Sequence, residues 1–401
     1  MLQVETALEK ARKNILGKGL TSNIIPGFAV TSPQAISQLL SISDLTEDSA
    51  PDNIIKIIYQ KIVNSLKKES FPNVTIVRGP KIVSATDNFD ALLFPPDNLG
   101  RSSTYTRWAD EENVLRTHTS ALVPGTLRGL SEKILEPMTL VFPGLVYRRD
   151  VIDPRHLDCF HQMDIWTLQS IEKIGSVSRS DLLKLVSIIC NAVLGSKTEI
   201  KIVETEHPYT KEGIEVYAVK NGQETEILEC GLIHPKVLHL VGIDPSKYCG
   251  LALGMGFERL VMSRKMLPDI RLIRSSNPRI MSQMLNLEPY KKVSNQPAIK
   301  RDLSFCVPIG SSEEDVCSLV REAFGNSSDL LEEVQLLTRT SFQNLEEIAK
   351  ERLGAQENQD NVLVRIILRH PDRTLEKIEA DKLYYAVYPK LHQGLKMGYL
   401  F

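Results

Sequence analysis

Two short stretches carry residue types that could bind a nucleotide and a carboxylate. The first is Tyr147-Arg148-Arg149-Asp150, which ends an apolar segment and is followed, after a polar loop, by Phe160-His161-Gln162. An arginine fixed on a strand can hold a phosphate and a substrate carboxylate in fork geometry, and it stabilises charge that develops on phosphorus. The same residues could instead form a solvated basic edge, or an ion pair between Arg148 and Asp150.

The second stretch is glycine-rich and runs from Gly250 to Leu260 with the sequence GLALGMGFERL. Glycines at the end of a strand let a nucleotide approach the backbone, and Arg259 at the start of the next helix would face the same cavity. Tight packing of strand on helix is the alternative reason for these glycines. A nucleotide site is favoured because the stretch follows the Arg148 segment by roughly a hundred residues. The sequence has no GxxxxGK[ST] loop, so binding of the P-loop kind is excluded.

A sheet must bring these stretches together, and the middle of the chain predicts an antiparallel one. A first hairpin is expected from Leu140–Arg148, through a loop at 153–155, back along Phe160–Leu168. A second alternates apolar and polar residues over 214–219, turns at Asn221-Gly222 and returns through 226–228. Strands that follow one another in hairpins pair antiparallel, which disfavours a doubly wound parallel sheet.

The flanking regions have a different character. Residues 1 to about 70 are predicted to be helical, with an apolar stripe from Ile54 to Leu66 at three- and four-residue spacing. After residue 289 the order is strand (303–307), helix (313–324), strands (334–337 and 361–368) and a last helix from about 376, with 343–359 as an insertion. If the tail adds a strand, this is the ferredoxin-like split βαβ plan.

Composition restricts the class of protein. The chain has 401 residues, a formal charge of −2 and no long apolar run, so no membrane span and no general attraction to nucleic acid is expected. The six cysteines show no zinc spacing, and the N-terminus shows no secretory or organellar leader. We therefore expect a cytoplasmic α+β enzyme with reduced thiols.

Three stretches together resemble phenylalanyl-tRNA synthetase, in particular its single-chain form with a C-terminal ferredoxin-fold anticodon-binding domain. They are Arg116-Thr117-His118-Thr119-Ser120, the segment from Val146 to Gln162, and Gly250–Leu260 with Pro268-Asp269-Ile270-Arg271. The last two match the class II motifs 2 and 3 in order and spacing. The likeness continues through 299–303 and 372–375. It implies a helical extension at 1–74, a class II catalytic domain at 75–288 and an anticodon-binding domain at 293–401.

The resemblance also implies roles for single residues, with ATP and Mg²⁺ as cofactors. Arg148 would hold the α-phosphate and the amino-acid carboxylate, and Arg259 would cover the adenine and reach the γ-phosphate; these two are the expected catalytic residues. The other expected ATP-binding residues are Asp150, His156 and Phe160. The expected amino-acid-binding residues are His118, Ser120, Gln162, Asp164, His207, Tyr209, Ala252 and Gly254. Glu226 is a candidate Mg²⁺ ligand, and Glu224 is another on the same strand. Singly, His118 or Phe160 could be core residues; their joint occurrence favours the site.

The sequence departs from the family pattern around the amino-acid pocket. His207-Pro208-Tyr209-Thr210 stands where two phenylalanines flank a proline, Asp164 replaces a glutamate and Glu229 replaces a glycine. Phenylalanine–tRNA ligase activity is the first expectation. The alternatives are a paralogue that activates another aromatic amino acid or serves a non-tRNA acceptor, and an inactive RNA-binding module. Retention of Arg148, His156, Phe160 and Arg259 argues against the inactive module.

Partners are less well specified by the sequence. Binding of tRNA through the C-terminal domain is expected, although residues 291–401 hold 15 Lys+Arg against 17 Asp+Glu, a difference of −2. Arg301, Arg365, Arg369 and Arg373 could form one local basic patch or lie on ordinary solvated faces. The protein could be a monomer or a homodimer, with the 54–66 helix either in a dimer contact or packed on its own domain.

Overall fold

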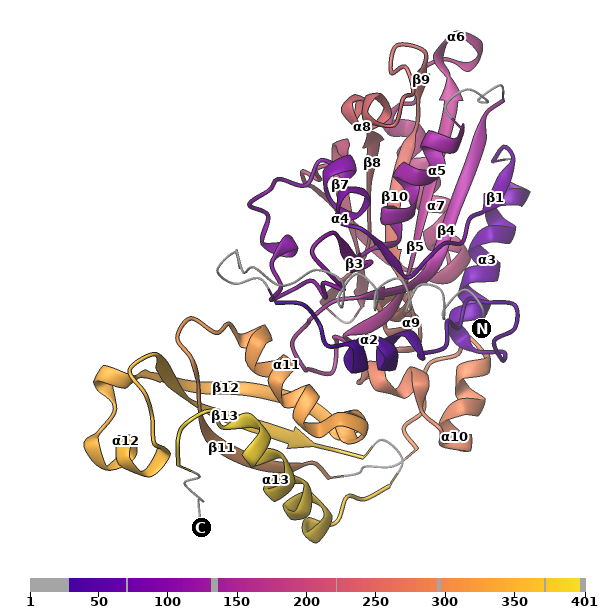
Figure 1. The fold of residues 1–401 in the computed structure, drawn as a ribbon. Coiled ribbons are helices and arrows are strands. Elements are labelled where there is room, and N and C mark those ends of the chain that lie inside the picture. Colours follow the sequence, from indigo (N-terminus) through magenta and orange to yellow (C-terminus); the bar gives the residue numbers. More distant parts are fainter. Residues whose placement is uncertain are drawn as a thin grey trace.

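An antiparallel sheet organises the larger part of the molecule (Figure 1). The computed structural model describes residues 29–69, 71–130, 136–220, 222–293, 297–370 and 373–396. The sheet has the order β1-β4-β5-β10-β8-β7-β6, and β9 pairs with β5. Every pairing is antiparallel except β1 with β4. The strands are β1 (Val74–Ile76), β4 (Met138–Tyr147), β5 (Cys159–Ser170), β6 (Glu199–Glu204), β7 (Thr210–Lys220), β8 (Gln223–Ile233), β9 (Tyr248–Cys249) and β10 (Leu251–Gly256). The predicted antiparallel sheet and both hairpins are confirmed; Asn221 of the second turn lies outside the described residues.

Successive side chains of each strand point to opposite faces, and each face has its own core. Val141, Ile165 and Leu253 belong to one cluster with helices α3 (Ile54–Lys68), α7 (Arg179–Val193) and α9 (Phe257–Lys265). Phe142, Trp166 and Ala252, one residue away, belong to a second cluster with α5 (Val123–Leu130) and α8 (Pro235–Leu240). Most of the sheet is therefore buried on both faces.

The apolar stripe in the N-terminal region forms α3, as its spacing predicts. Ile54, Ile58, Ile62 and Leu66 are fully buried, and the Asn53 side chain caps the helix by accepting a hydrogen bond from the Lys56 N–H. The helix packs against α7 and shares the core under the sheet. It therefore packs on its own domain, and the core does not end at the expected boundary between residues 74 and 75.

Shorter elements cover the edges of this unit. They are α2 (Pro33–Leu40), β2 (Ile82–Ser84) paired with β3 (Asn113–Leu115), α4 (Ala85–Asn88), α6 (Ile171–Ile174), α10 (Pro278–Met281) and 3₁₀ turns at Asp90–Leu92, Leu99–Arg101, Thr119–Leu122, Ile270–Arg274 and Ser282–Leu285. No helix in the described ranges is both long and apolar enough to cross a bilayer. The six cysteines are free thiols.

The C-terminal unit is a three-stranded antiparallel sheet of order β11-β13-β12. Its elements are β11 (Ile299–Pro308), α11 (Glu313–Phe324), a 3₁₀ turn (Gly325–Leu330), β12 (Leu331–Ser341), a second 3₁₀ turn (Phe342–Asn344), α12 (Glu347–Leu353), β13 (Gln359–Leu368) and α13 (Lys377–Leu391). Helices α11 and α13 pack together and share one core with the sheet. The order β-α-β-β-α follows the split βαβ plan, and the expected insertion holds α12. The expected final strand lies outside the described residues.

The C-terminal unit contacts the loop that joins β4 to β5. Arg321 on α11 donates to the Asp150 carbonyl (Nη2–O 2.9 Å) and lies 3.4 Å from the Asp158 carboxylate. Arg149 donates to the Ser318 hydroxyl (2.9 Å), and the backbone N–H of Val334 donates to the Ile152 carbonyl (2.9 Å). The loop is thereby fixed at several points along its length.

Candidate active site

All five predicted ATP-binding residues line one cleft at the end of the sheet. Arg148, Asp150, His156 and Phe160 come from the β4–β5 hairpin, and Arg259 comes from α9. The cleft has a volume of about 200 Å³ and is also lined by Gln162, Glu226, Glu229 and Gly254. The structure thus brings together residues that lie up to 111 positions apart in the sequence.

Strand periodicity explains why these side chains share a face. Phe160, Gln162 and Asp164 alternate along β5, and Gly254 on β10 pairs directly with Asp164. On β8, an irregularity in the pairing with β7 near Tyr217 turns both Ile227 and Leu228 toward the helix-covered core. Because of this bulge, Glu226 and Glu229 both reach the cleft although they are three residues apart.

Arg148 is held in place by two contacts, and within the described residues no acidic side chain pairs with its terminal nitrogens. Its Nε donates to the Thr117 carbonyl (2.9 Å), and its guanidinium lies over the Phe160 ring, 5.3 Å from the centroid. In the part of the chain described, no ion pair joins Arg148 to Asp150. An arginine fixed in this way is available for an anion in the cleft.

Two other charged residues of the cleft, His156 and Arg259, are paired with carboxylates. His156 Nδ1 lies 2.8 Å from Asp153 Oδ2, and this hydrogen bond raises the pKa of His156 above its usual value. Arg259 Nη1 donates to Glu226 Oε2 (2.8 Å), with both side chains partly exposed. Glu224 pairs with Lys201 at an exposed position instead. Of the two candidate carboxylates, Glu226 is the one that lines the cleft.

A second group of predicted residues lies beside the cleft and is almost fully buried. His118 Nδ1 lies 2.9 Å from the Ser120 hydroxyl, and its ring stacks on Phe94 with centroids 5.4 Å apart. Burial, followed by the nearby charge of Arg148, lowers the pKa of His118 to about 3, so the ring is neutral. The Gln162 carbonyl oxygen accepts from the Thr119 N–H (3.3 Å), which connects this group to the cleft.

Asp164 lies deep in this group and is bonded within the protein. Its carboxyl accepts from the Thr119 hydroxyl (2.5 Å) and from Trp166 Nε1 (3.3 Å), and the residue is 1% exposed. Burial raises the pKa of Asp164 to about 7, a shift that these hydrogen bonds reduce and that Glu229 increases. Asp164 does not line the cleft itself.

The residues that depart from the family pattern contact one another. The Tyr209 hydroxyl donates to Glu229 Oε1 (3.1 Å), and His207 Nδ1 lies 3.5 Å from Glu229 Oε2. Tyr209 also stacks on Trp166 with centroids 5.8 Å apart. The polar groups at 207 and 209 therefore have a common partner, which single-residue reasoning from the sequence did not identify.

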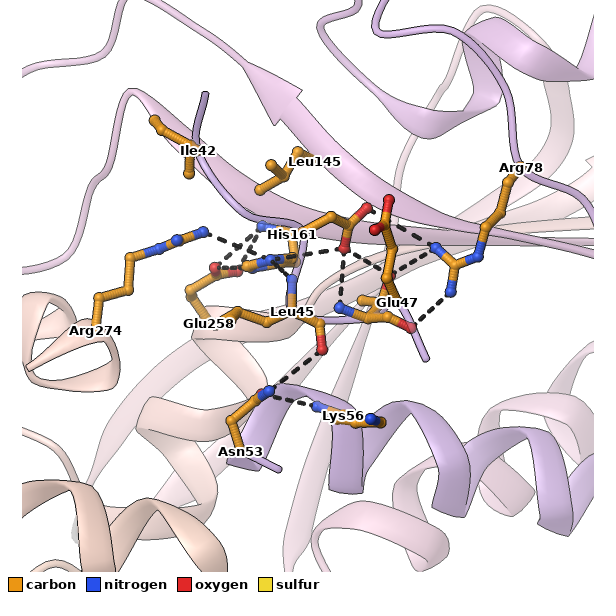
Figure 2. A network of polar contacts seen from close by, with 12 residues as sticks. Ile42, Leu45, Glu47, Asn53, Lys56, Arg78, Leu145, His161, Glu258 and Arg274 are labelled. Carbon is orange, nitrogen blue, oxygen red and sulfur yellow. Dashed lines mark hydrogen bonds and ion pairs between the residues drawn. The ribbon is translucent and has the colours of Figure 1, made fainter. Parts of the chain in front are cut away.

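A buried network fixes the start of α9, and Figure 2 shows it from close by. His161 points away from the cleft, and its Nδ1 donates to Glu258 Oε1 (2.7 Å) while its Nε2 accepts from the Leu45 N–H (2.9 Å). The backbone N–H of His161 also donates to the Glu258 carboxylate. Since Arg259 follows Glu258, this network positions the arginine. Sequence reasoning missed Glu258 because a buried carboxylate and an exposed one look the same in a sequence.

Arg116, the first residue of the stretch Arg116–Ser120, is buried and makes packing contacts with β4. Its Nε donates to the Leu145 carbonyl (2.7 Å), and its guanidinium fills the space where Gly144 has no side chain. A Cβ at residue 144 would lie 2.2 Å from Arg116 Nη2. The contact holds β4 against the segment that carries His118 and Ser120.

Comparison with known families decides what this arrangement is. The model of the family "tRNA synthetases class II core domain (F)" matches residues 45–284, which hold every predicted site residue. The chain belongs to this family. Its match begins before α3 and ends before the C-terminal sheet.

Individual relatives of this class II synthetase agree. The phenylalanine–tRNA ligase alpha subunit of Prochlorococcus marinus (strain NATL2A) is 32% identical over 283 residues, which are 70% of this chain and 82% of that protein. The alpha subunit of Histophilus somni (strain 2336) is 34% identical over 230 residues, 57% of this chain and 66% of its own length. Among solved structures, a pyrrolysyl tRNA synthetase from Desulfitobacterium hafniense matches with a TM-score of 0.43 and 18% identity, covering 60% of this chain and 77% of that chain. That likeness is too weak to add to the assignment.

Proposed function

We propose that the protein is a phenylalanine–tRNA ligase, which activates phenylalanine with ATP and transfers it to tRNA. The observation that carries this is the convergence of Arg148, Phe160 and Arg259 in one cleft beside Gln162 and Gly254. Family membership and the printed activity of the relatives support the same conclusion. The alternative of another aromatic substrate or a non-tRNA acceptor is not favoured, because those relatives are named as phenylalanine–tRNA ligases.

The chemistry needs no nucleophile from the protein. The amino-acid carboxylate attacks the α-phosphorus of ATP and the bond to pyrophosphate breaks, which gives the aminoacyl adenylate. A ribose hydroxyl of tRNA then attacks the carbonyl carbon of this adenylate, and AMP leaves. Arg148 would hold both the carboxylate and the α-phosphate and stabilise the charge on phosphorus, and Phe160 would stack on the adenine. Asp150 would accept from the adenine amino group, and His156 and Arg259 would contact the triphosphate. Catalysis is then positioning and charge stabilisation.

The amino acid would lie on the β5–β10 side of the cleft. His118, Ser120 and Gln162 would surround its polar end, with the buried Asp164 behind them, and Gly254 would lie between this end and the ring, which His207, Tyr209 and Ala252 would surround. Gly254 has no side chain and lines the cleft, whereas Ala252 is fully buried in one core cluster with Trp166 and Tyr209 and does not line it.

Magnesium, which the family implies, fits the residues present. The described residues hold no group of three metal-ligating side chains. Mg²⁺ is usually bound by one or two carboxylates together with substrate phosphates, so Glu226, one of the carboxylates that line the cleft, is compatible with it. When bound, the ion would neutralise charge on the triphosphate.

We propose that the C-terminal unit binds the anticodon region of tRNA, although the four arginines predicted to form its basic patch are engaged within the protein. Arg301, Arg365, Arg369 and Arg373 are each ion-paired, with Asp381, Asp302, Glu332 and Glu379. RNA binding would therefore need exchange of these partners, or contacts through exposed rings such as Tyr385. The names of the relatives mark them as one subunit of an assembly. For this chain, a monomer or a homodimer stays a prediction. A cytoplasmic location also stays a prediction.

ATP–pyrophosphate exchange with each of the twenty amino acids tests the activity, followed by charging of tRNA. We expect phenylalanine to support the fastest exchange and tRNA to accept the product. Exchange driven best by another amino acid, or no charging of any tRNA, would overturn the proposal.

A further inference from the structure

Gly254 lies between two acidic residues on the neighbouring strands, one on each side. Because glycine has no side chain, a gap separates their carboxyl groups. Gly254 on β10 pairs with Asp164 on β5 and with Glu229 on β8. A Cβ on Gly254 would lie 3.7 Å from Asp164 Oδ2, from Glu229 Oε1 and from Gln162 Nε2. Three polar groups from two neighbouring strands therefore converge on the space that the glycine leaves open.

The two carboxyl groups are not equally available to a ligand. Asp164 is 1% exposed, both of its oxygens accept hydrogen bonds from the protein, and it does not line the cleft. The Glu229 side chain is 33% exposed and lines the cleft together with Arg148 and Gln162. Glu229 is thus the carboxylate that the cleft presents beside Gly254.

Glu229 also differs from the two other glutamates of the cleft. Glu226 is paired with Arg259, and Glu258 is buried against His161. Within the described ranges no arginine or lysine pairs with Glu229, which is instead held by the Tyr209 hydroxyl and His207. A carboxylate that is fixed in position and lacks a permanent cationic partner is suited to a cationic ligand.

The substrate has one cationic group in the right place. An α-ammonium is separated from its own carboxylate by a single carbon, so a carboxylate held by Arg148 brings the ammonium next to Gln162 and Gly254. We propose that Glu229 binds the α-ammonium group of the amino-acid substrate across Gly254, in place of the internally bonded Asp164. This rests on the proposed function, and it explains why His207, Tyr209 and Glu229 occur together.

The test compares ligands that differ in one charged group, measured by calorimetry so that no catalysis is needed. Phenylalaninol keeps the ammonium and lacks the carboxylate, whereas 3-phenylpropanoate has only the carboxylate. We expect Glu229→Gln to weaken phenylalaninol binding about tenfold or more, because a charge-assisted hydrogen bond is lost, and to change 3-phenylpropanoate binding less than twofold. In exchange assays the KM for phenylalanine should rise while the KM for ATP stays the same.

Glu224→Gln is the matched control, since it removes the same charge from the same strand at an exposed position paired with Lys201. If Glu229→Gln does not fold, Tyr209→Phe, which releases one contact to Glu229, should give a smaller loss of the same kind. Equal binding of phenylalaninol to wild type and Glu229→Gln, or equal weakening of both ligands, would overturn the inference. A wild-type protein that binds neither phenylalanine nor phenylalaninol would instead contradict the proposed function.

Discussion

The position of Arg259 is fixed by its neighbours in the structure. It follows Glu258, which is fixed by three hydrogen bonds from His161, and it reaches across the cleft to Glu226. Its guanidinium is partly exposed, so little of the fold depends on it. The residue can therefore be removed without disturbing the core.

We expect Arg259→Ala to reduce ATP–pyrophosphate exchange about 10²- to 10³-fold, because one charge-stabilising contact to the triphosphate is lost. The melting temperature should stay close to that of wild type. Arg179→Ala removes an exposed arginine paired with Glu204 at the far edge of the sheet and serves as the control. Normal exchange by Arg259→Ala would contradict the role given to this residue.

Asp164 gives the protein a pH dependence of stability. Its pKa is about 7 in the folded protein against 3.8 for the free side chain, because the carboxyl is buried. The folded protein therefore binds this proton more tightly than the unfolded chain does. The stability that the protonated carboxyl contributes is fully present below pH 3.8 and is lost as the pH rises through 7. Ionisation of Asp164 therefore opposes folding in the neutral range.

We expect Asp164→Asn, which cannot ionise, to lose less stability than wild type between pH 4 and pH 8, by roughly a few kcal/mol at most. Chemical denaturation at a series of pH values measures this difference. Parallel pH profiles for the two proteins would show that the carboxyl does not titrate in this range.

At the scale of single residues, the sequence predicted which residues lie together better than it predicted the surroundings of each one. The five ATP-binding candidates were found because arginine, histidine and phenylalanine recur at a spacing that matches a known pattern, and they do line one cleft. The bonded state of Asp164 and the contact of Tyr209 with Glu229 could not be predicted, because they depend on which strands are neighbours.

At the scale of elements, strand β10 and Gly250, the residue that precedes it, show why the glycines of this stretch are not equivalent. A Cβ on Gly250 would lie 1.8 Å from the Thr167 carbonyl oxygen. Because this oxygen belongs to the backbone of β5, it cannot move aside as a side chain could. A Cβ on Gly254 would make only ordinary contacts at 3.7 Å. One glycine is needed for strand packing and the other for the space above the strand.

We expect Gly250→Ala to destabilise the protein by about 1–3 kcal/mol or more and Gly254→Ala to keep nearly the wild-type melting temperature. Gly254→Ala should still raise the KM for phenylalanine, because its methyl group enters the polar gap between β5 and β8. Thermal unfolding and exchange kinetics on both variants separate the two effects. Equal destabilisation by the two substitutions would be evidence against this distinction.

Regular elements were well predicted where one period dominates. The helix at 313–324 has the predicted bounds, since Ser312 and Asp315 form a capping box at its start. The 54–66 stripe forms α3, but the sequence left open whether this helix makes a dimer contact or packs on its own domain, because a stripe shows that a helix is covered and not by what. The bulge near Glu226 was also unpredictable, since nothing in the alternation of β8 marks it.

At the scale of the whole molecule, the C-terminal unit supports the loop that carries Asp150 and His156. Arg321 on α11 holds the Asp150 carbonyl and approaches Asp158, and Arg149 contacts Ser318. Two parts of the chain more than a hundred residues apart therefore determine the shape of the cleft together.

We expect Arg321→Ala to raise the KM for ATP several-fold with a smaller effect on the KM for phenylalanine, because the loop loses its anchor at Asp150. Arg365→Ala, in the same unit but paired with Asp302 on the neighbouring strand, is the control. Exchange kinetics measure both constants. An unchanged KM for ATP in Arg321→Ala would show that the loop keeps its shape without this contact.

The contact of Arg116 with Gly144 has a consequence for the evolution of the chain. The guanidinium occupies the place of a side chain at 144, and the backbone of Gly144 has a φ of +156°, which residues with a side chain rarely adopt. A lineage that shortens residue 116 therefore removes only one of the two obstacles to a larger residue at 144. The glycine is thus expected to outlast the arginine, so the history of substitutions at this point has a direction.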